Sequence, residues 1–318
     1  MLFMTGPINQ PFQLFPLFRE RVWGRQSLAP FFAVSAGSEP VGEAWFTFQD
    51  NVTTLGPKLG ALLSEEPGIL GTAADPDYPA LCPLLVKFLF TTSRLSVQVH
   101  PDDAYARQHY GTLGKTEAWY VLDAQPPGEV AAGFREEITT ERLRSSALSG
   151  EIEQLLDWRK VEAGDFIFVP AGTVHAIGAG LTICEIQENS DITYRLYDYG
   201  RPRELHLDDG VQVSKLGSHQ HATKPKPITS WRDQLLECAY FRIERMTVPD
   251  RLRFVGQNPY YILLICIEGG GLIDAMPFAA GHVWMVPANS AGFTLEGANS
   301  RWIVTYTADE RFNGFLAG

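Results

Sequence analysis

Residues 95–103, with the sequence Leu-Ser-Val-Gln-Val-His-Pro-Asp-Asp, constrain the fold more than any other part of the chain. Apolar and polar residues alternate up to His100, as in a half-buried strand whose successive side chains point to opposite faces. Ser96, Gln98 and His100 therefore share one face. Such a polar face either faces solvent or lines a cavity that holds a metal ion. The residues downstream favour the second interpretation.

Most of the chain is predicted to be strand. Short helices are expected after Pro101, where Asp102 and Asp103 favour the positive helix end and Gly111 closes the helix, and within residues 139–158. Strands are predicted at residues 83–90, 117–122, 165–170, 181–187 and 193–199, and residues 240–308 are predicted to be almost entirely strand and turn.

A short internal repeat suggests two similar modules. Residues 163–175 and 280–292 share the core Gly-x-x-x-x-Val-Pro-Ala, but Gly292 stands where the first copy has His175. We predict two copies of one β-barrel module: residues 1–220 with a helical insertion at about 136–160, and residues 221–318, which lack metal ligands. A polar linker is expected at residues 217–227, with His219 and His221 on the surface.

The charge balance restricts the partners. Lys and Arg total 26 against 37 Asp and Glu, a net charge of −11, which disfavours sequence-independent binding to nucleic acid. A small anionic substrate held by a few local cations remains compatible with it. No signal peptide or membrane span is expected. The four cysteines are scattered among apolar residues, so we predict free thiols and a reducing cytoplasm.

Four residues form a candidate metal site: Gln98, His100, Glu117 and His175. Two neutral imidazoles, a carboxylate and an amide oxygen suit Zn²⁺ or a similar divalent ion. Taken alone, each has a simpler interpretation, with His175 hydrogen-bonded in a turn and Glu117 paired with Lys115. The four together predict one site.

The order Gln-x-His-Pro, Gly-Lys-x-Glu, Pro-Ala-Gly-x-x-His resembles the metal-binding pattern of cupins and, in more detail, the type I mannose-6-phosphate isomerases of the short bacterial branch. The family's early Trp-Gly-Gly is Trp23-Gly24-Arg25 here, and its Gly-Glu-Ser-Trp-Glu is Gly-Glu-Ala-Trp-Phe at residues 42–46, which leaves the N-terminal contribution to the pocket open. The resemblance rests on residues 83–87, 95–103, 114–120, 169–177 and 185–201.

The resemblance implies a mainly β fold with two cupin-type barrels (jelly rolls), one Zn²⁺ per chain, and interconversion of mannose 6-phosphate and fructose 6-phosphate by proton transfer through an enediol(ate). Arg195 matches the family's active-site arginine and is expected to stabilise the enediolate or position the sugar. Lys115, Glu185 and Asp191 are candidates for proton transfer. Lys115 could serve as a base only if burial or the metal depresses its pKa.

Ser96 and Lys87 are expected at the phosphate end of the substrate, because Ser96 shares the strand face of Gln98. Simpler interpretations exist here too. Glu185 could be a structural partner of Arg195, Asp191 a turn residue, and Lys87 a surface lysine.

Two other functions compete with the isomerase. Two histidines and a carboxylate also form the facial triad of an iron-dependent cupin oxygenase. A non-catalytic sugar-phosphate-binding cupin is the other alternative. Cations around the site disfavour the oxygenase, and the intact ligand set disfavours the non-catalytic protein. A monomer or homodimer is expected, and the role of the second barrel is open.

Overall fold

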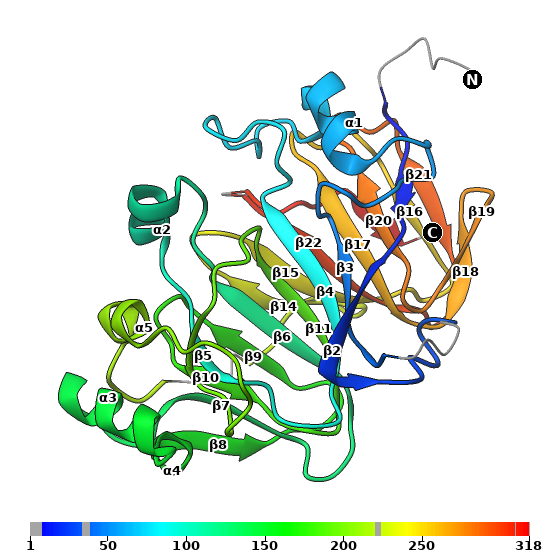
Figure 1. Cartoon of the computed structure of the whole chain (residues 1–318). Coiled ribbons are helices and arrows are strands. Elements are labelled where there is room, and N and C mark those ends of the chain that lie inside the picture. The colour runs from blue at the N-terminus through cyan, green and yellow to red at the C-terminus, as the bar shows by residue number, and fades with distance from the viewer. Residues whose placement is uncertain (1–7, 34–38, 220–223, 309, 318) are drawn as a thin grey trace.

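The structure is a computed structural model that describes residues 8–33, 39–219, 224–308 and 310–317, and Figure 1 shows two β-rich halves side by side. The named strands pair in antiparallel fashion within four sheets, two in each half. The predicted mainly β, cupin-type architecture is confirmed.

The first half contains a six-stranded sheet and a five-stranded sheet. The six-stranded sheet has the order β2 (Leu17–Arg25), β3 (Val41–Phe46), β4 (Leu84–Phe90), β11 (Leu181–Glu188), β6 (Glu117–Ala124) and β9 (Phe166–Val169). The five-stranded sheet has the order β12 (Tyr194–Tyr197), β5 (Val97–Val99), β10 (His175–Ile177), β7 (Glu129–Phe134) and β8 (Leu156–Lys160).

The second half is built in the same way from residues late in the chain, with one exception. Its larger sheet has the order β1 (Phe12–Leu14), β20 (Val283–Val286), β17 (Ile262–Glu268), β22 (Arg301–Tyr306), β15 (Arg242–Thr247), β14 (Arg232–Glu237) and β13 (Lys226–Thr229). Its smaller sheet has the order β19 (Met276–Ala279), β18 (Gly270–Ile273), β21 (Phe293–Glu296), β16 (Arg251–Phe254) and β23 (Phe315–Ala317). The exception is β1, which comes from the start of the chain. The division of the chain into two modules at residue 220 stays a prediction. Phe12 pairs with Met285, so one strand from the N-terminus belongs to the second half.

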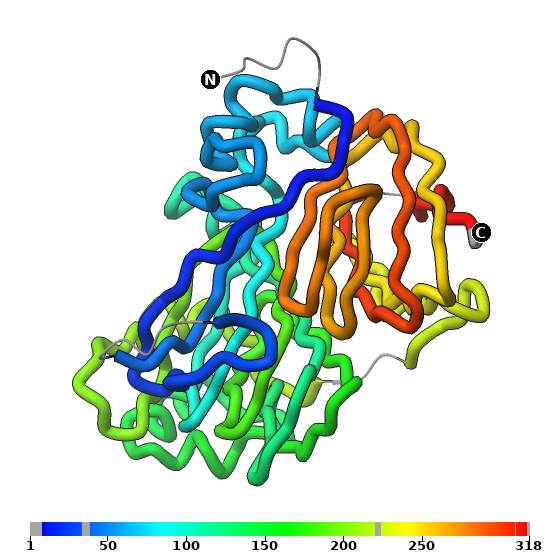
Figure 2. Tube along the Cα trace, turned by 90° about the vertical axis from the view of Figure 1, so that its right-hand side faces the viewer, coloured from blue at the N-terminus to red at the C-terminus, as the bar shows by residue number. Residues whose placement is uncertain are grey.

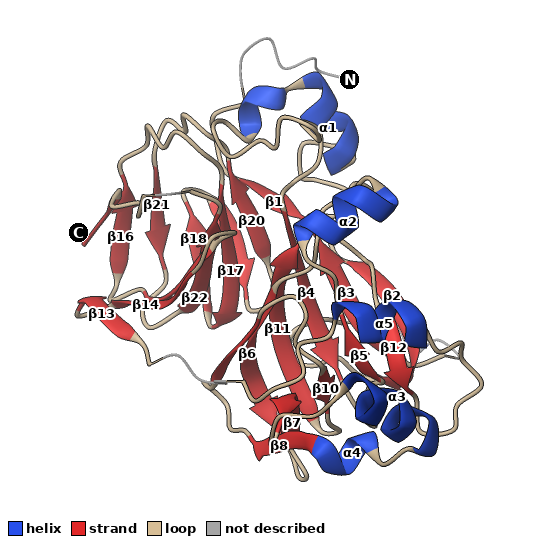
Figure 3. Cartoon of the chain, turned by 90° about the vertical axis from the view of Figure 1, so that its left-hand side faces the viewer, coloured by secondary structure: helices blue, strands red, loops and turns tan. Residues whose placement is uncertain are grey.

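Helices α3, α4 and α5 lie along the side of the first half that is remote from the second half, while α2 lies nearer to α1 (Figure 3). They are α2 (Asp103–Tyr110), α3 (Thr140–Ser149), α4 (Ile152–Leu155) and α5 (Leu207–Val213), while α1 (Leu59–Glu65) and the 3₁₀ turn η1 (Pro67–Ile69) lie near the second half. The helix expected after Pro101 is present, but Asp102 is its N-cap, accepting a hydrogen bond from Tyr105 N–H, so Pro101 lies outside the helix. Gly111 ends it with a φ of 62°.

The larger sheet of the first half is buried on both faces. Leu84, Val86 and Phe88 of β4 belong to one hydrophobic cluster with the strands of the second half, which Figure 2 shows packed against this sheet. The alternate residues Leu85, Lys87 and Leu89 are also buried, on the face toward the first half's interior. The second half therefore packs against the sheet that forms one wall of that interior.

The internal repeat corresponds to matching backbone. In both copies a glycine with positive φ, Gly164 or Gly281, precedes a strand, β9 or β20. A second positive φ follows each strand, at Gly172 and Asn289.

One expectation about the linker is wrong. His219 is half-buried rather than on the surface, because its Nε2 lies 2.7 Å from the carbonyl oxygen of Phe168. His221 lies outside the described residues.

Candidate active site and metal centre

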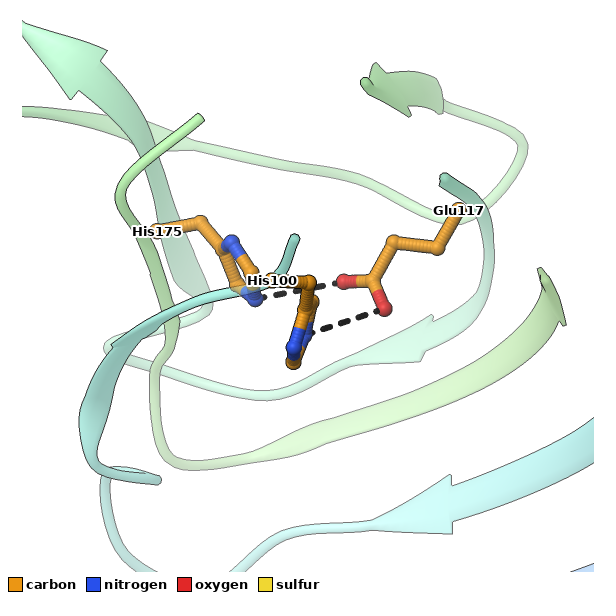
Figure 4. A group of neighbouring side chains, drawn as sticks. All are labelled: His100, Glu117 and His175. Carbon is orange, nitrogen blue, oxygen red and sulfur yellow. Dashed lines mark ion pairs between the residues drawn. The ribbon is translucent and has the colours of Figure 1, made fainter. Parts of the chain in front are cut away.

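Three side chains predicted as metal ligands meet inside the first half (Figure 4). His100 follows β5, His175 begins β10 and Glu117 begins β6. Strands β5 and β10 are neighbours, with His175 opposite Gln98, while β6 lies in the other sheet. The ligand atoms of these three residues lie within 4.8 Å of one another, and all three side chains are buried.

Both imidazoles are oriented by backbone carbonyls. His100 Nδ1 lies 2.8 Å from Ile192 O, and His175 Nδ1 lies 2.8 Å from Thr173 O. A carbonyl can only accept, so each Nδ1 carries the proton and each Nε2 presents a lone pair. The Nε2 atoms lie 3.5 Å (His100) and 3.2 Å (His175) from the oxygens of Glu117. This arrangement is typical of histidines that ligate metal ions.

The converging atoms lack the partners that burial normally requires. His100 Nε2 and both oxygens of Glu117 are buried without a hydrogen bond from any described residue. Buried polar groups are nearly always paired, and unpaired ones are costly. A divalent cation between these atoms would satisfy them together, so the residues present fit a metal ion.

Burial shifts the pKa values of all three residues in the cluster. Burial lowers the pKa of His175 to about 4 and that of His100 well below its usual value, so both rings are neutral near pH 7. Burial and the nearby Glu185 raise the pKa of Glu117 to about 7. Neutral imidazoles bind metal without first losing a proton.

Gln98, the fourth predicted ligand, lies beside the three. Its Nε2 is 3.2 Å from His175 Nε2, and Ser96 Oγ is 3.3 Å from its Oε1. The orientation of an amide is assigned from its hydrogen-bond partners. With the amide reversed, Gln98 Oε1 would point toward the metal cluster, as a ligand atom must. Ligation by Gln98 stays a prediction.

A cavity of about 360 Å³ adjoins the centre. Seven of the ten residues predicted for the site line it, and the remaining three are His100, Glu117 and His175 of the metal cluster described above. The predicted residues on its wall are Lys87, Ser96, Gln98, Lys115, Glu185, Asp191 and Arg195, of which Gln98 is also a predicted ligand.

Lys87 and Glu185 face each other in the cavity wall. They pair across β4 and β11, with Lys87 Nζ 3.5 Å from Glu185 Oε2. Trp119 Nε1–H donates to Glu185 Oε1 at 3.1 Å. Burial alone would raise the pKa of Glu185, but Lys87 and Lys115 lower it, so this carboxylate is ionised. Lys87 is 3% exposed and is not a surface lysine.

Lys115 lies between the cavity and the cluster, with Nζ 3.5 Å from Glu117 Oε2. Burial alone would lower the pKa of Lys115, but the carboxylates of Glu117, Glu185 and Asp191 raise it. The ammonium form is therefore favoured. This favours charge stabilisation over a role as a base.

Arg195 and Asp191 lie in the segment that follows β11. Arg195 pairs with Gln98 across β12 and β5, and its Nη1 donates to Glu204 O at 2.7 Å. Its Nε is buried without a partner among the described residues. Asp191 is exposed to the cavity, and its carboxylate makes no hydrogen bond or ion pair with any described residue.

The N-terminal strands contribute to the cavity, which the sequence left open. Arg21, Trp23 and Glu43 line it, and so does Arg203 from beyond β12. Arg25, in place of the family's glycine, points elsewhere: its Nη1 donates to Thr182 Oγ1 and its Nη2 to Leu181 O. Arg21, Trp23 and Glu43 reach the cavity because β2 pairs with β3 and β3 pairs with β4. No local pattern in the sequence indicates this pairing.

Glu188 supports the strand of Glu117, because its Oε2 accepts a hydrogen bond from Thr116 N–H at 2.7 Å. Burial and Asp103 raise the pKa of Glu188 to about 8. The contribution of Glu188 to stability is then complete below about pH 4 and is lost as the pH rises through about 8.

Glu188→Gln cannot ionise, so its free energy of unfolding should exceed the parent's by about 1–3 kcal/mol near pH 8 and match it near pH 4. Urea unfolding at several pH values measures this. If the free energies of unfolding of the parent and of Glu188→Gln differed by the same amount at every pH, the burial of a titrating carboxyl at position 188 would be contradicted.

No protein-family model matches the sequence. Over 311 residues the chain is 37% identical to the mannose-6-phosphate isomerase ManA of Bacillus subtilis, a match that covers 91% of this chain and 96% of that protein. The chain belongs to the mannose-6-phosphate isomerase family. A second member, the mannose-6-phosphate isomerase of Streptococcus mutans, is 38% identical over 280 residues, covering 83% of this chain and 87% of that protein.

Solved structures of the family share the fold. The crystal structure of the mannose 6-phosphate isomerase from Bacillus subtilis matches with a TM-score of 0.84 and 30% identity, over 93% of this chain and 99% of that one. A mutant of phosphomannose isomerase from Salmonella typhimurium matches with a TM-score of 0.77 over 94% of this chain and 99% of that one, but at 15% identity it shows the fold alone. Among the described residues, no helix is both long and apolar enough to cross a membrane.

Proposed function

We propose that this protein interconverts mannose 6-phosphate and fructose 6-phosphate, with one Zn²⁺ held by Gln98, His100, Glu117 and His175. The observation that carries the proposal is the convergence of buried, unpartnered ligand atoms beside a cavity lined with cations. The two relatives named as mannose-6-phosphate isomerases support the choice of substrate.

The reaction moves a proton between C2 and C1 of the sugar phosphate through an enediol(ate). Zn²⁺ would supply Lewis-acid stabilisation of the oxygen on which negative charge develops. The ammonium of Lys115, whose pKa the surrounding carboxylates raise, adds positive charge on the cavity side of the cluster.

The substrate's phosphate is assigned to Lys87, Ser96 and Arg195. Among these, Arg195 is the cation without a carboxylate within 4 Å among the described residues, since Lys87 lies 3.5 Å from Glu185. The unpartnered Nε of Arg195 leaves a donor for an anionic ligand. Arg203, by contrast, is engaged through two hydrogen bonds to Asp198, at 2.6 and 2.7 Å.

Asp191 is assigned as the base that moves the proton. Glu185 is held by Lys87 and Trp119 in its ionised form, which makes it a weak proton acceptor. Lys115 is held in its ammonium form. Asp191 is the carboxylate on the cavity wall whose oxygens make no bond to the described residues, and it is close enough to raise the pKa of Lys115.

The test is direct observation of both sugar phosphates by NMR after incubation with purified, metal-loaded protein. Conversion from either side to one equilibrium mixture is expected. A folded, metal-loaded protein without conversion would exclude the isomerase and leave the sugar-phosphate-binding cupin. Tightly bound iron with oxygen uptake would instead establish the oxygenase.

Three finer points belong to the same proposal. Elemental analysis of protein grown without added metal tests zinc as the native ion. Light scattering tests a monomer or homodimer. A reducing cytoplasm is supported by the free thiols of Cys82, Cys184 and Cys266, all buried, and fractionation of the native cells tests it.

A further inference from the structure

Lys87 has an unusual environment for a buried lysine. It is 3% exposed, and no described residue forms a hydrogen bond with its ammonium. Its nearest carboxylate oxygen is Glu185 Oε2, at 3.5 Å. The ammonium also lies over the ring of Trp45, 4.6 Å from the ring centre. Without donated hydrogen bonds, the direction of the ammonium depends on these two neighbours, and a ring face attracts a cation mainly along one direction.

Trp45 does not line the cavity, although it is next to Lys87. The two residues pair across β3 and β4, and Trp45 is 4% exposed. The indole is fixed by its own hydrogen bond, from Nε1–H to Glu43 Oε2 at 2.8 Å. Any effect of Trp45 on a ligand in the cavity must therefore pass through a neighbour.

Glu43 connects Trp45 to a second cation. The same oxygen, Oε2, also accepts a hydrogen bond from Arg21 Nη2 at 2.7 Å. Gly42 leaves room for this contact, because a Cβ at position 42 would lie 2.6 Å from the Cβ of Arg21. The charge of Glu43 is thus engaged by Arg21 at the cavity wall rather than presented to an anionic ligand.

We propose that Glu43 and Trp45 are positioning residues for the substrate's phosphate: Glu43 fixes the indole of Trp45, the indole aims the ammonium of Lys87 into the cavity, and Arg21 neutralises Glu43. The inference rests on the proposed function, in which Lys87 contacts the phosphate. It explains why β3, which carries none of the three clustered metal ligands, has a buried carboxylate and a buried indole that are hydrogen-bonded to each other.

The test is a double-mutant cycle between Trp45 and Lys87 in the full-length, metal-loaded protein. Trp45→Leu removes the ring, and it should raise KM for mannose 6-phosphate about 3- to 30-fold with kcat changed less than about twofold. In the Lys87→Gln background the same change should leave KM unaltered, because the ammonium that the ring positions is gone. Equal effects in both backgrounds, or a loss of kcat and metal content without a change in KM, would overturn the proposal.

Glu43 provides a second test that does not depend on the folding of Trp45→Leu. Glu43→Gln keeps an oxygen that accepts from Trp45 Nε1–H, whereas Glu43→Ala does not, so Glu43→Gln should have the smaller increase in KM. Equal increases would overturn the link from Glu43 to Trp45. Trp158→Leu is the matched control. Trp158 Nε1–H also donates a hydrogen bond, to the backbone carbonyl of Glu153, and the ring lies under a cation, Arg94. Because Arg94, unlike Lys87, does not line the cavity, KM should not change.

The two proposals fail in different ways. A parent protein that does not turn over mannose 6-phosphate contradicts the proposed function. A parent that turns it over, while the Trp45 effect persists without Lys87, contradicts only the positioning role. Titration of mannose 6-phosphate by calorimetry repeats the cycle on Kd, and the same non-additivity is expected there.

Discussion

His175→Ala should bind no more than a small fraction of the metal held by the parent protein and should lose on the order of 1,000-fold in kcat/KM. The expected loss corresponds to about 4 kcal/mol of Lewis-acid stabilisation. The imidazole is buried, is oriented by Thr173 O and directs Nε2 at Glu117, so its removal opens the cluster. His100→Ala should behave in the same way, because Ile192 O orients it equivalently. Metal content by elemental analysis and kcat/KM are measured on the same samples.

His109→Ala is the matched control for these variants. His109 is exposed on α2, stacked on Tyr105, and contributes nothing to the cluster. Its metal content and activity should equal those of the parent. Full metal content in His175→Ala with the circular dichroism of the parent would show that the metal binds elsewhere.

Asp191→Asn should lower kcat by about 100- to 10,000-fold, the usual contribution of a general base, while metal content stays unchanged. The amide keeps the size of the side chain but cannot take up the proton. Asp191 is exposed to the cavity and bonds to no described residue, so its replacement should not destabilise the fold. Steady-state kinetics and thermal unfolding of the same preparation measure both expectations.

Glu185→Gln tests whether Glu185 rather than Asp191 is the general base, and Asp250→Asn is the control for replacing an exposed aspartate. Glu185→Gln leaves Lys87 with less opposing charge, so its main effect is expected on KM. Asp250 is exposed in the second half, and Asp250→Asn should behave as the parent. If Glu185→Gln lost more in kcat than Asp191→Asn, then Glu185 would be the base.

The metal cluster was predictable from the sequence because its signals are local. The alternation at residues 95–100 places Gln98 and His100 on one strand face, and the proline and glycine before His175 mark a turn that starts the next strand. The resemblance of the motif order to the metal-binding pattern of cupins then implied that these faces meet. The structure brings His100, Glu117 and His175 together as this reasoning requires.

The opposite wall of the cavity could not be predicted in the same way. Arg21 and Glu43 on this wall, and Trp45 next to it, acquire their roles from the register in which β2, β3 and β4 pair. Register depends on packing between segments far apart in the sequence. The pairing of β1 with β20 is a still longer connection. Lys87 illustrates the ambiguity, since a lysine on an apolar strand fits both a surface and a buried site until the facing Glu185 is known.

The most direct measurement is the interconversion of mannose 6-phosphate and fructose 6-phosphate by one preparation, assayed as purified, after removal of metal by a chelator, and after Zn²⁺ is restored. Elemental analysis accompanies each assay. The structure predicts activity that is lost with the metal and regained with one Zn²⁺ per chain, and no recovery in His175→Ala. Undiminished turnover by protein shown to be free of metal would contradict the account.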